Sequence, residues 1–288
     1  MSTISDLNSS FIIELLFEEE VKRPTAGAVL RAAKETFGDI EAITRNNDIT
    51  SFAVQNYTAY KKEDNKFESV MLGMGKVSEF RQDSISELER SQIWNIADSE
   101  KLLAKCKYAV RIFDANASGQ VPQQRAVMLM QWLEAVLPLF PACKLVWVKP
   151  SGKLQSVQAI KRFKQQGISK FIFSMVNIRF FNIPDSNEFI VDSTGLNGIG
   201  LSDVQFHFKR LNPNKVANLA YSLIWYILSS EENIIKDGDT IDGMDDSGKM
   251  TSAVQWKCRY EDSIVEPLRS VLDIEMGKYA AGDRSEEN

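Results

Sequence analysis

The sequence predicts a mixed α+β fold, in which helices pack on a mixed, largely antiparallel sheet. Short apolar runs of strand length alternate with segments of helical periodicity, and Gly, Pro, Asn and Asp separate many of them. The 288 residues are 44% hydrophobic, which is ordinary for a globular protein, so the chain can bury a sizeable core. Both observations favour a compact protein with a sheet covered by helices.

The first part of the chain predicts the order strand, helix and three strands. The apolar run at 11–17 is typical of a buried strand. A helix over 25–37 follows Pro24, and Gly38 supplies its end. Three strand-like segments come next, at 40–45, 51–60 and 67–74.

Strands and helices alternate in the middle of the chain, which indicates β-α-β units. Pro122 begins a long helix with an apolar face. The continuous apolar core of 144–150 suits a buried strand. In order, we expect a helix over 91–105, a strand at 108–115, the helix from 122, the strand at 144–150, a helix over 156–166 that ends at Gly167, and strands at 171–183 and 188–193.

The last part of the chain places a strand at 203–210 before a long helix. Asn212 is expected to cap this helix, with Pro213 at its first position. Its apolar residues form a stripe that we interpret as core, and Trp225 widens that stripe. A polar stretch at 236–250 then precedes a strand at 252–260.

No linker rich in Pro, Gly or Ser divides the chain, and no repeat is present. We therefore predict a single α+β domain over residues 11–278, with flexible segments at 1–10 and 279–288. The alternative is two fused α/β halves that meet near residues 85–105.

The residue counts exclude several kinds of catalytic site. His207 is the only histidine, so a His-rich zinc site, a two-histidine iron site and a HExxH protease are impossible within one chain. Cys106, Cys143 and Cys258 are scattered and are expected to be small buried hydrophobes. The chain also lacks the P-loop, the nucleophile elbow and the dinucleotide fingerprint.

The net charge and the hydropathy of the chain limit the classes of partner that we expect it to bind. A net charge of −5 and a pI of about 5.2 disfavour sequence-independent binding to nucleic acid. No apolar run approaches the roughly 20 residues of a membrane span, and the start MSTISDLNSS lacks the regions of a signal peptide. We therefore expect a cytoplasmic protein that binds neither nucleic acid nor membrane; nothing in the sequence indicates its oligomeric state.

A glycine-rich loop is the most distinctive feature of the chain. Gly195, Gly198 and Gly200 allow positive φ angles or a close backbone approach, and Asp192 and Asp203 flank them. A strand follows this loop instead of a helix, so phosphate binding at a helix N-terminus is not supported. The segment is either a functional loop or a connection with demanding backbone geometry, and we interpret the glycines themselves as structural.

A second loop, DGDTIDGMDDSG, contains Gly238 and Asp239. Mg²⁺ and Ca²⁺ take oxygen ligands from loops of this kind. This loop lacks the EF-hand order of ligands and has no glutamate at the twelfth position, and Asp and Gly are also the commonest turn formers. We therefore predict no cofactor, with Mg²⁺ or Ca²⁺ as the alternative.

Two arginines are candidate ligand-binding or partner-binding residues. The strand MVNIRFF presents Asn177 and Arg179 on one face. Arg179 can hold a carboxylate with two hydrogen bonds, and Asp192 in the next strand is its expected partner, because buried charges are normally paired. Arg269 is expected to anchor the C-terminal segment.

Several motifs in a fixed order resemble a bacterial family, domain of unknown function 4261. The resemblance implies membership of that family and transfers no activity or catalytic residue. Ser202 stands where the family usually has proline, a variation that a loop tolerates. The motifs are CKYAVRIFDA (106–115), PACKLVWVKPSGKL (141–154), NIRFF (177–181), VDSTGLNGIGLSDVQFHF (191–208), LNPNKVANLAYSLIWYI (211–227), IKDGDTIDG (235–243) and WKCRYEDSIVEPLRSVLDI (256–274).

Two classes of function remain. The first is a non-catalytic protein-binding module, which neutralises a toxin or accompanies a secreted effector, since an acidic protein suits a basic partner. The second is a metal-dependent enzyme that handles phosphoesters or nucleotides with Arg179 and three aspartates, Asp192, Asp203 and Asp239. The single histidine and the lack of a recognisable nucleophile favour binding. An exposed apolar patch of several hundred Å² would support it.

Overall fold

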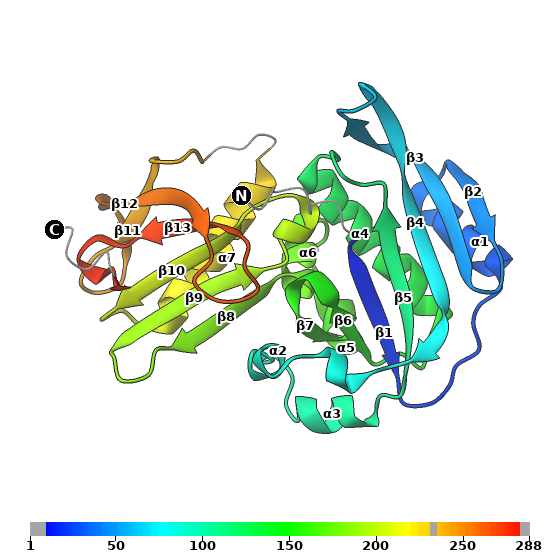
Figure 1. Cartoon of the computed structure of the whole chain (residues 1–288), viewed down its shortest axis with the longest axis horizontal. Coiled ribbons are helices and arrows are strands. Elements are labelled where there is room, and N and C mark those ends of the chain that lie inside the picture. Colours follow the sequence, from blue (N-terminus) through cyan, green and yellow to red (C-terminus); the bar gives the residue numbers. More distant parts are fainter. Residues whose placement is uncertain (1–9, 231–234, 283–288) are drawn as a thin grey trace. The chain divides into compact units, whose positions relative to one another are not determined.

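The computed structural model describes residues 10–230 and 235–282, and this part of the chain forms two β-sheets with seven α-helices (Figure 1). The predicted α+β class is confirmed. The chain divides into two compact units: unit 1 is Met1–Met175 with Gly198–Gly200, and unit 2 is Val176–Asn197 with Leu201–Asn288.

Unit 1 is built on a seven-stranded sheet in which every neighbouring pair is antiparallel. All the strands predicted up to residue 150 are present, and β7 is an additional strand. Because β1 lies between β5 and β6 and is antiparallel to both, β5 and β6 point the same way, as a β-α-β unit requires. In spatial order the strands are β2 (Ile40–Arg45), β3 (Ile49–Lys61), β4 (Lys66–Glu79), β5 (Tyr108–Ala115), β1 (Ile12–Phe17), β6 (Leu145–Val148) and β7 (Lys153–Ser156).

Two helices of unit 1 begin as the sequence predicts. In α1 the Thr25 hydroxyl accepts a hydrogen bond from the Ala28 amide at 3.2 Å, and the helix ends at Gly38. Pro122 is the first residue of α4, which buries Trp132 against the sheet. No helix among the described residues is long and apolar enough to cross a membrane. The helices of unit 1 are α1 (Ala26–Phe37), α2 (Glu87–Ser91), α3 (Ser99–Lys105), α4 (Pro122–Val136), α5 (Val157–Arg162) and α6 (Ile168–Met175).

The helix predicted over 91–105 is wrong, because the segment contains the end of α2, a loop and the separate helix α3. Asp98 adopts a left-handed conformation with φ 55°, which an α-helix does not allow. The Asn95 side chain in the same loop donates to the Leu154 carbonyl at 3.0 Å. Tertiary hydrogen bonding therefore overrides the helical pattern here.

The strand predicted at 171–183 is wrong in its first half. Residues up to Met175 belong to α6, and only Asn177–Asn182 form a strand, β8. Phe171 and Met175, four residues apart, are both fully buried, which suits one face of a helix. A short continuous apolar run does not distinguish a buried helix from a buried strand. The helix predicted over 156–166 is also shorter, because α5 ends at Arg162.

The division between the units falls after Met175 and not near 85–105. Segment 85–105 lies inside unit 1, where Ile85 and Leu103 join a buried cluster with Leu16 and Trp147. Apolar contacts therefore hold this segment against the first sheet.

Unit 2 contains a six-stranded sheet and the helix α7 (Pro213–Ser229). One pair, β10 with β13, is parallel and the others are antiparallel. Figure 1 shows α7 against one face of the sheet and the loop at 263–269 across the other. In spatial order the strands are β11 (Thr240–Met244), β12 (Met250–Asp262), β13 (Ser270–Glu275), β10 (Asp203–Lys209), β9 (Glu188–Thr194) and β8.

The C-terminal residues of unit 2 are more ordered than predicted up to residue 282. Tyr279, Ala280 and Ala281 are buried, and Ala280 forms a β-bridge with Phe208. The expectation of a flexible tail from 279 is therefore wrong for these residues. The rest of that tail, and almost all of the predicted flexible segment 1–10, lie outside the described residues.

Lys153 in β7 gives unit 1 a pH-dependent stability. Its side chain is buried, and burial lowers the pKa of its ammonium group to about 7. Between pH 7 and the ordinary lysine value, the unfolded chain binds a proton that the folded chain lacks. The free energy of unfolding therefore rises with pH across that window. Below about pH 7 the ammonium group is charged in both states, and the cost of burying it does not change with pH.

We predict that Lys153→Met increases the free energy of unfolding at pH 7, because it removes the penalty for burying an ammonium group. The gain should shrink as the pH rises towards 10. Urea denaturation at pH 7 and pH 9.5 measures both effects, with the exposed Lys164→Met as the control. If the free energy of unfolding depends on pH equally in Lys153→Met and in the unmodified protein, Lys153 is not the source of the pH dependence.

Candidate functional site

The register of the second sheet places five polar residues in one row across five strands. Arg179 of β8 is opposite Asp192 of β9, which is opposite Gln205 of β10. The row continues through Asp273 of β13 to Arg259 of β12. Because directly opposed residues point to the same side of a sheet, all five lie on one face. The first four are buried.

Asp192 is held between two guanidinium groups. Arg179 donates from Nε to Oδ1 at 2.8 Å and from Nη2 to Oδ2 at 2.5 Å. Arg269 donates from Nη2 to Oδ2 at 2.6 Å. The three side chains are 0%, 4% and 6% exposed, respectively. The expected pair of Arg179 and Asp192 is therefore present, and it gains Arg269 as a third member.

Asp203 is the second carboxylate of the same network. Its Oδ1 accepts hydrogen bonds from the Ser193 hydroxyl at 2.9 Å and the Leu196 amide at 3.1 Å, and its Oδ2 accepts one from the Asn197 side chain at 3.0 Å. Arg269 Nε lies 3.3 Å from Oδ2. Complete burial raises the pKa of Asp203, while Arg269 and these hydrogen bonds oppose that shift. Protein groups thus surround both carboxylates.

The two arginines also fix the loop that covers this face. Arg179 donates from Nη1 to the Glu266 carbonyl at 2.8 Å. Arg269 donates to the Val265 carbonyl at 2.9 Å. The network thereby connects two strands to the loop at 263–269, and Arg269 anchors the segment as expected.

The remaining candidates divide between this face and a distant turn. Asn177 is buried and opposite Thr194, two residues along from the Arg179 pair and so on the same face. Asp239 is exposed and accepts a hydrogen bond from the Lys236 amide at 2.7 Å. It precedes β11, four strand spacings or about 19 Å from β9. Asp239 therefore does not meet Asp192.

Each of the glycines named as structural occupies a position where another residue would be strained or would clash. Gly195 and Gly200 have φ angles of 117° and 94°, and Gly238 in the distant turn has 88°. Gly198 belongs to unit 1, where an added Cβ would lie 2.9 Å from atoms of both Phe11 and Pro150. These conformations and this close approach account for the glycines as structural residues. No group of three His, Cys, Asp or Glu side chains suited to a metal ion occurs in the described part of the chain.

The prediction that Trp225 belongs to the core stripe of α7 is wrong. Trp225 is 52% exposed and Tyr226 is 51% exposed, while Leu223 and Ile224 between α7 and the sheet are buried. We call the exposed residues from 218 to 229 the α7 face. None of them is charged, and the exposed Lys215 lies one turn before this face. The residues of the α7 face are Asn218, Tyr221, Ser222, Trp225, Tyr226 and Ser229.

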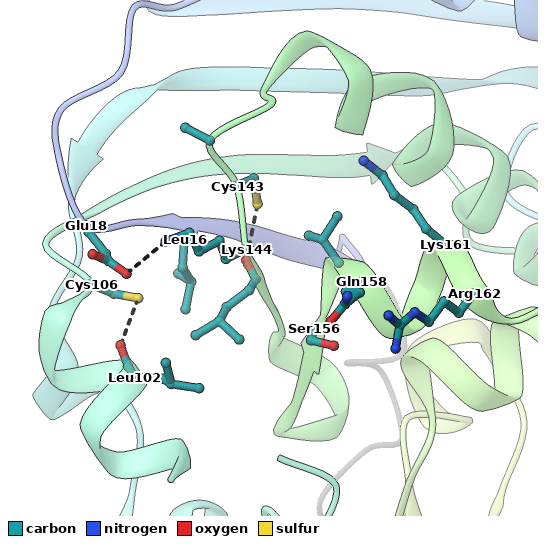
Figure 2. Close-up of a pocket in the computed structure, with 13 residues that line it drawn as sticks. Leu16, Glu18, Leu102, Cys106, Cys143, Lys144, Ser156, Gln158, Lys161 and Arg162 are labelled. Atoms are coloured by element: carbon teal, nitrogen blue, oxygen red, sulfur yellow. Dashed lines mark hydrogen bonds and ion pairs between the residues drawn. The ribbon is translucent and has the colours of Figure 1, made fainter. Parts of the chain in front are cut away.

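Unit 1 contains a pocket of about 600 Å³ (Figure 2). Two of its lining residues are Cys106 and Cys143, which are buried as predicted, like Cys258. Burial raises the pKa of the Cys106 thiol to about 11 and that of the Cys143 thiol to about 12. Both thiols are therefore protonated at neutral pH and are poor nucleophiles. Sequence spacing gave no indication of this pocket.

The fold and the buried network define a two-sheet α+β protein whose polar cluster lies under a loop in unit 2. Residues 192–275 match the family model described as "Domain of unknown function (DUF4261)". The match begins at Asp192 and includes Asp203 and Arg269, so the predicted resemblance is confirmed for the segment that contains most of the network. No curated protein and no solved structure matches the chain.

We predict that Asp192→Asn lowers the free energy of unfolding by about 3–5 kcal/mol, because buried Arg179 loses its carboxylate partner and Arg269 keeps only Asp203. Asp239→Asn, in an exposed turn, should leave stability nearly unchanged because the amide oxygen still accepts the Lys236 hydrogen bond. Urea denaturation of the two variants checks this contrast. Similar small losses in the free energy of unfolding of both variants would show that the network contributes little to stability.

Proposed function

We propose that the protein is a non-catalytic protein-binding module of the cytoplasm and that the α7 face is its contact surface. The observation that supports this function is the composition of that face. The solvent side of a helix in a globular protein normally carries charged residues. The α7 face has none, and three of its six residues are aromatic.

The composition of the α7 face matches that of protein interfaces. Tyr and Trp are enriched in the centres of interfaces, where Lys, Glu and Asp are depleted, and Ser and Asn supply adaptable hydrogen bonds. Tyr221 and Trp225 are four residues apart and so lie side by side on the helix. With Tyr226 they present roughly 300 Å² of aromatic surface, within the range that marks functional patches.

The opposite side of α7 makes this face rigid. Val216, Leu223 and Leu228 are buried against the sheet. A partner therefore meets aromatic side chains on a helix whose position is already fixed, which lowers the entropy lost on binding. We expect the partner to offer an apolar groove, as in other complexes where a helix face inserts into a groove.

Two further observations bear on the choice of function. The enzyme hypothesis requires three aspartates in one pocket, but the strand order separates Asp239 from Asp192. All three cysteines are free, which is typical of proteins in a reducing compartment. The acidity that suggests a basic toxin or effector as partner belongs to the whole chain and not to the α7 face, so we expect apolar contacts to dominate recognition.

A photo-crosslinking residue at Ser222 tests the proposal in cells that naturally contain the protein. Ser222 is exposed in the centre of the α7 face, so a partner should form a discrete covalent adduct. Trp225→Ser should reduce the adduct at least about tenfold, since tryptophans are frequent binding hot spots. Mass spectrometry of the adduct identifies the partner.

Trp94→Ser is the matched control, because Trp94 in unit 1 is 63% exposed. The control should leave the adduct unchanged. Absence of any adduct at Ser222, or an adduct that persists in Trp225→Ser, would contradict the proposed surface. An adduct between two copies of this chain would identify the partner as the protein itself.

A further inference from the structure

The pocket in unit 1 has an aliphatic floor. Leu16 of β1, Leu145 of β6 and Val157 of α5 line it, together with Leu102 of α3. No aromatic side chain is among its lining residues, so the pocket offers no ring on which a nucleobase or another flat ring would stack. A floor of this kind favours an alkyl chain, whose binding energy comes from removing methylene groups from water.

Three cationic side chains, Lys144, Lys161 and Arg162, line this pocket, although the protein is acidic overall. Lys144 pairs with Glu18 at 3.5 Å. Lys161 and Arg162 follow each other in the last turn of α5, and neither forms an ion pair with any residue in the described part of the chain. Figure 2 shows these two side chains along one side of the pocket, with Glu18 and Cys106 along the other. The basic side is therefore available to an acidic group.

From this combination we propose that the pocket binds a free aliphatic carboxylate, with the alkyl chain on the leucine floor and the carboxylate beside Lys161 and Arg162. The pocket volume lies within the usual range for small-molecule sites, about 300–1,000 Å³. An arginine and a lysine at the rim suit a carboxylate, which accepts their charge-assisted hydrogen bonds. Both pocket thiols are protonated, so binding is reversible and no covalent step is involved.

Isothermal titration of the full-length protein with decanoate tests the site. We expect saturable binding to one site with Kd on the order of 100 μM, as befits a ligand of this size. In the series octanoate, decanoate and dodecanoate, each added methylene should tighten binding by about two- to fourfold, because each adds buried apolar surface.

Variants separate the charged rim from the apolar floor. The double variant Lys161→Gln and Arg162→Gln should weaken decanoate binding roughly fivefold, as expected for two exposed charge contacts, and leave decanol binding unchanged. Lys164→Gln, two residues further along the chain and outside the pocket, is the matched control and should have no effect. Ala142→Trp places an indole in the pocket mouth from an exposed position and should abolish binding of both ligands.

Three results would overturn the proposal. The first is no measurable binding of any of the three carboxylates below their micelle-forming concentrations. The second is equal binding of decanoate and decyltrimethylammonium, which would show that the rim does not select an anion. The third is unchanged decanoate binding in Ala142→Trp with an unaltered melting temperature, which would place the ligand elsewhere on the protein.

Discussion

The position of Asp192 between the guanidinium groups of Arg179 and Arg269 is the constraint on which unit 2 depends. A buried carboxylate is stable only where hydrogen-bond donors replace the water molecules that it has lost. Here both arginines donate hydrogen bonds to Asp192. Arg179 comes from the neighbouring strand, and Arg269 from the end of the covering loop. A shift of one residue in β9 would turn Asp192 to the face that packs on α7, so the network also selects the strand register.

This constraint explains why the residues that most resemble a catalytic site are structural. Aspartates, arginines and glycines close together in the chain are equally what a buried ionic network beneath a loop requires. In Asp192 and Asp203, the hydrogen-bonding capacity is taken up by protein groups. The surfaces for which we propose a partner or a ligand are different ones: the uncharged α7 face in unit 2 and the pocket with a basic rim in unit 1.

Local pairings were predictable from the sequence, and long-range ones were not. Arg179 and Asp192 lie on consecutive strands joined by a short turn, so alternation alone suggests that they meet. Gln205 and Asp273 are 68 residues apart and meet only because β10 pairs in parallel with β13, a strand that the pattern did not reveal. The row of polar residues therefore depends on topology.

Two surface features escaped prediction for a related reason. Helical periodicity identifies the stripe of α7 that faces the sheet, but it does not show how wide the covered stripe is, so Trp225 was assigned to the wrong side. The pocket draws its floor from β1, α3, β6 and α5, which are far apart in the chain. Neither the width of a contact nor a cavity between four elements is encoded in the spacing of neighbouring residues.

A double-mutant cycle between Asp192 and Arg269 tests the central claim most directly. The free energy of unfolding is measured for Asp192→Asn, Arg269→Gln, the double variant and the unmodified protein. If the network acts as one structural unit, the two substitutions should be coupled by about 1–3 kcal/mol, so that the second removes much less stability than the first. A coupling energy near zero would show that the two side chains contribute independently and would contradict the account.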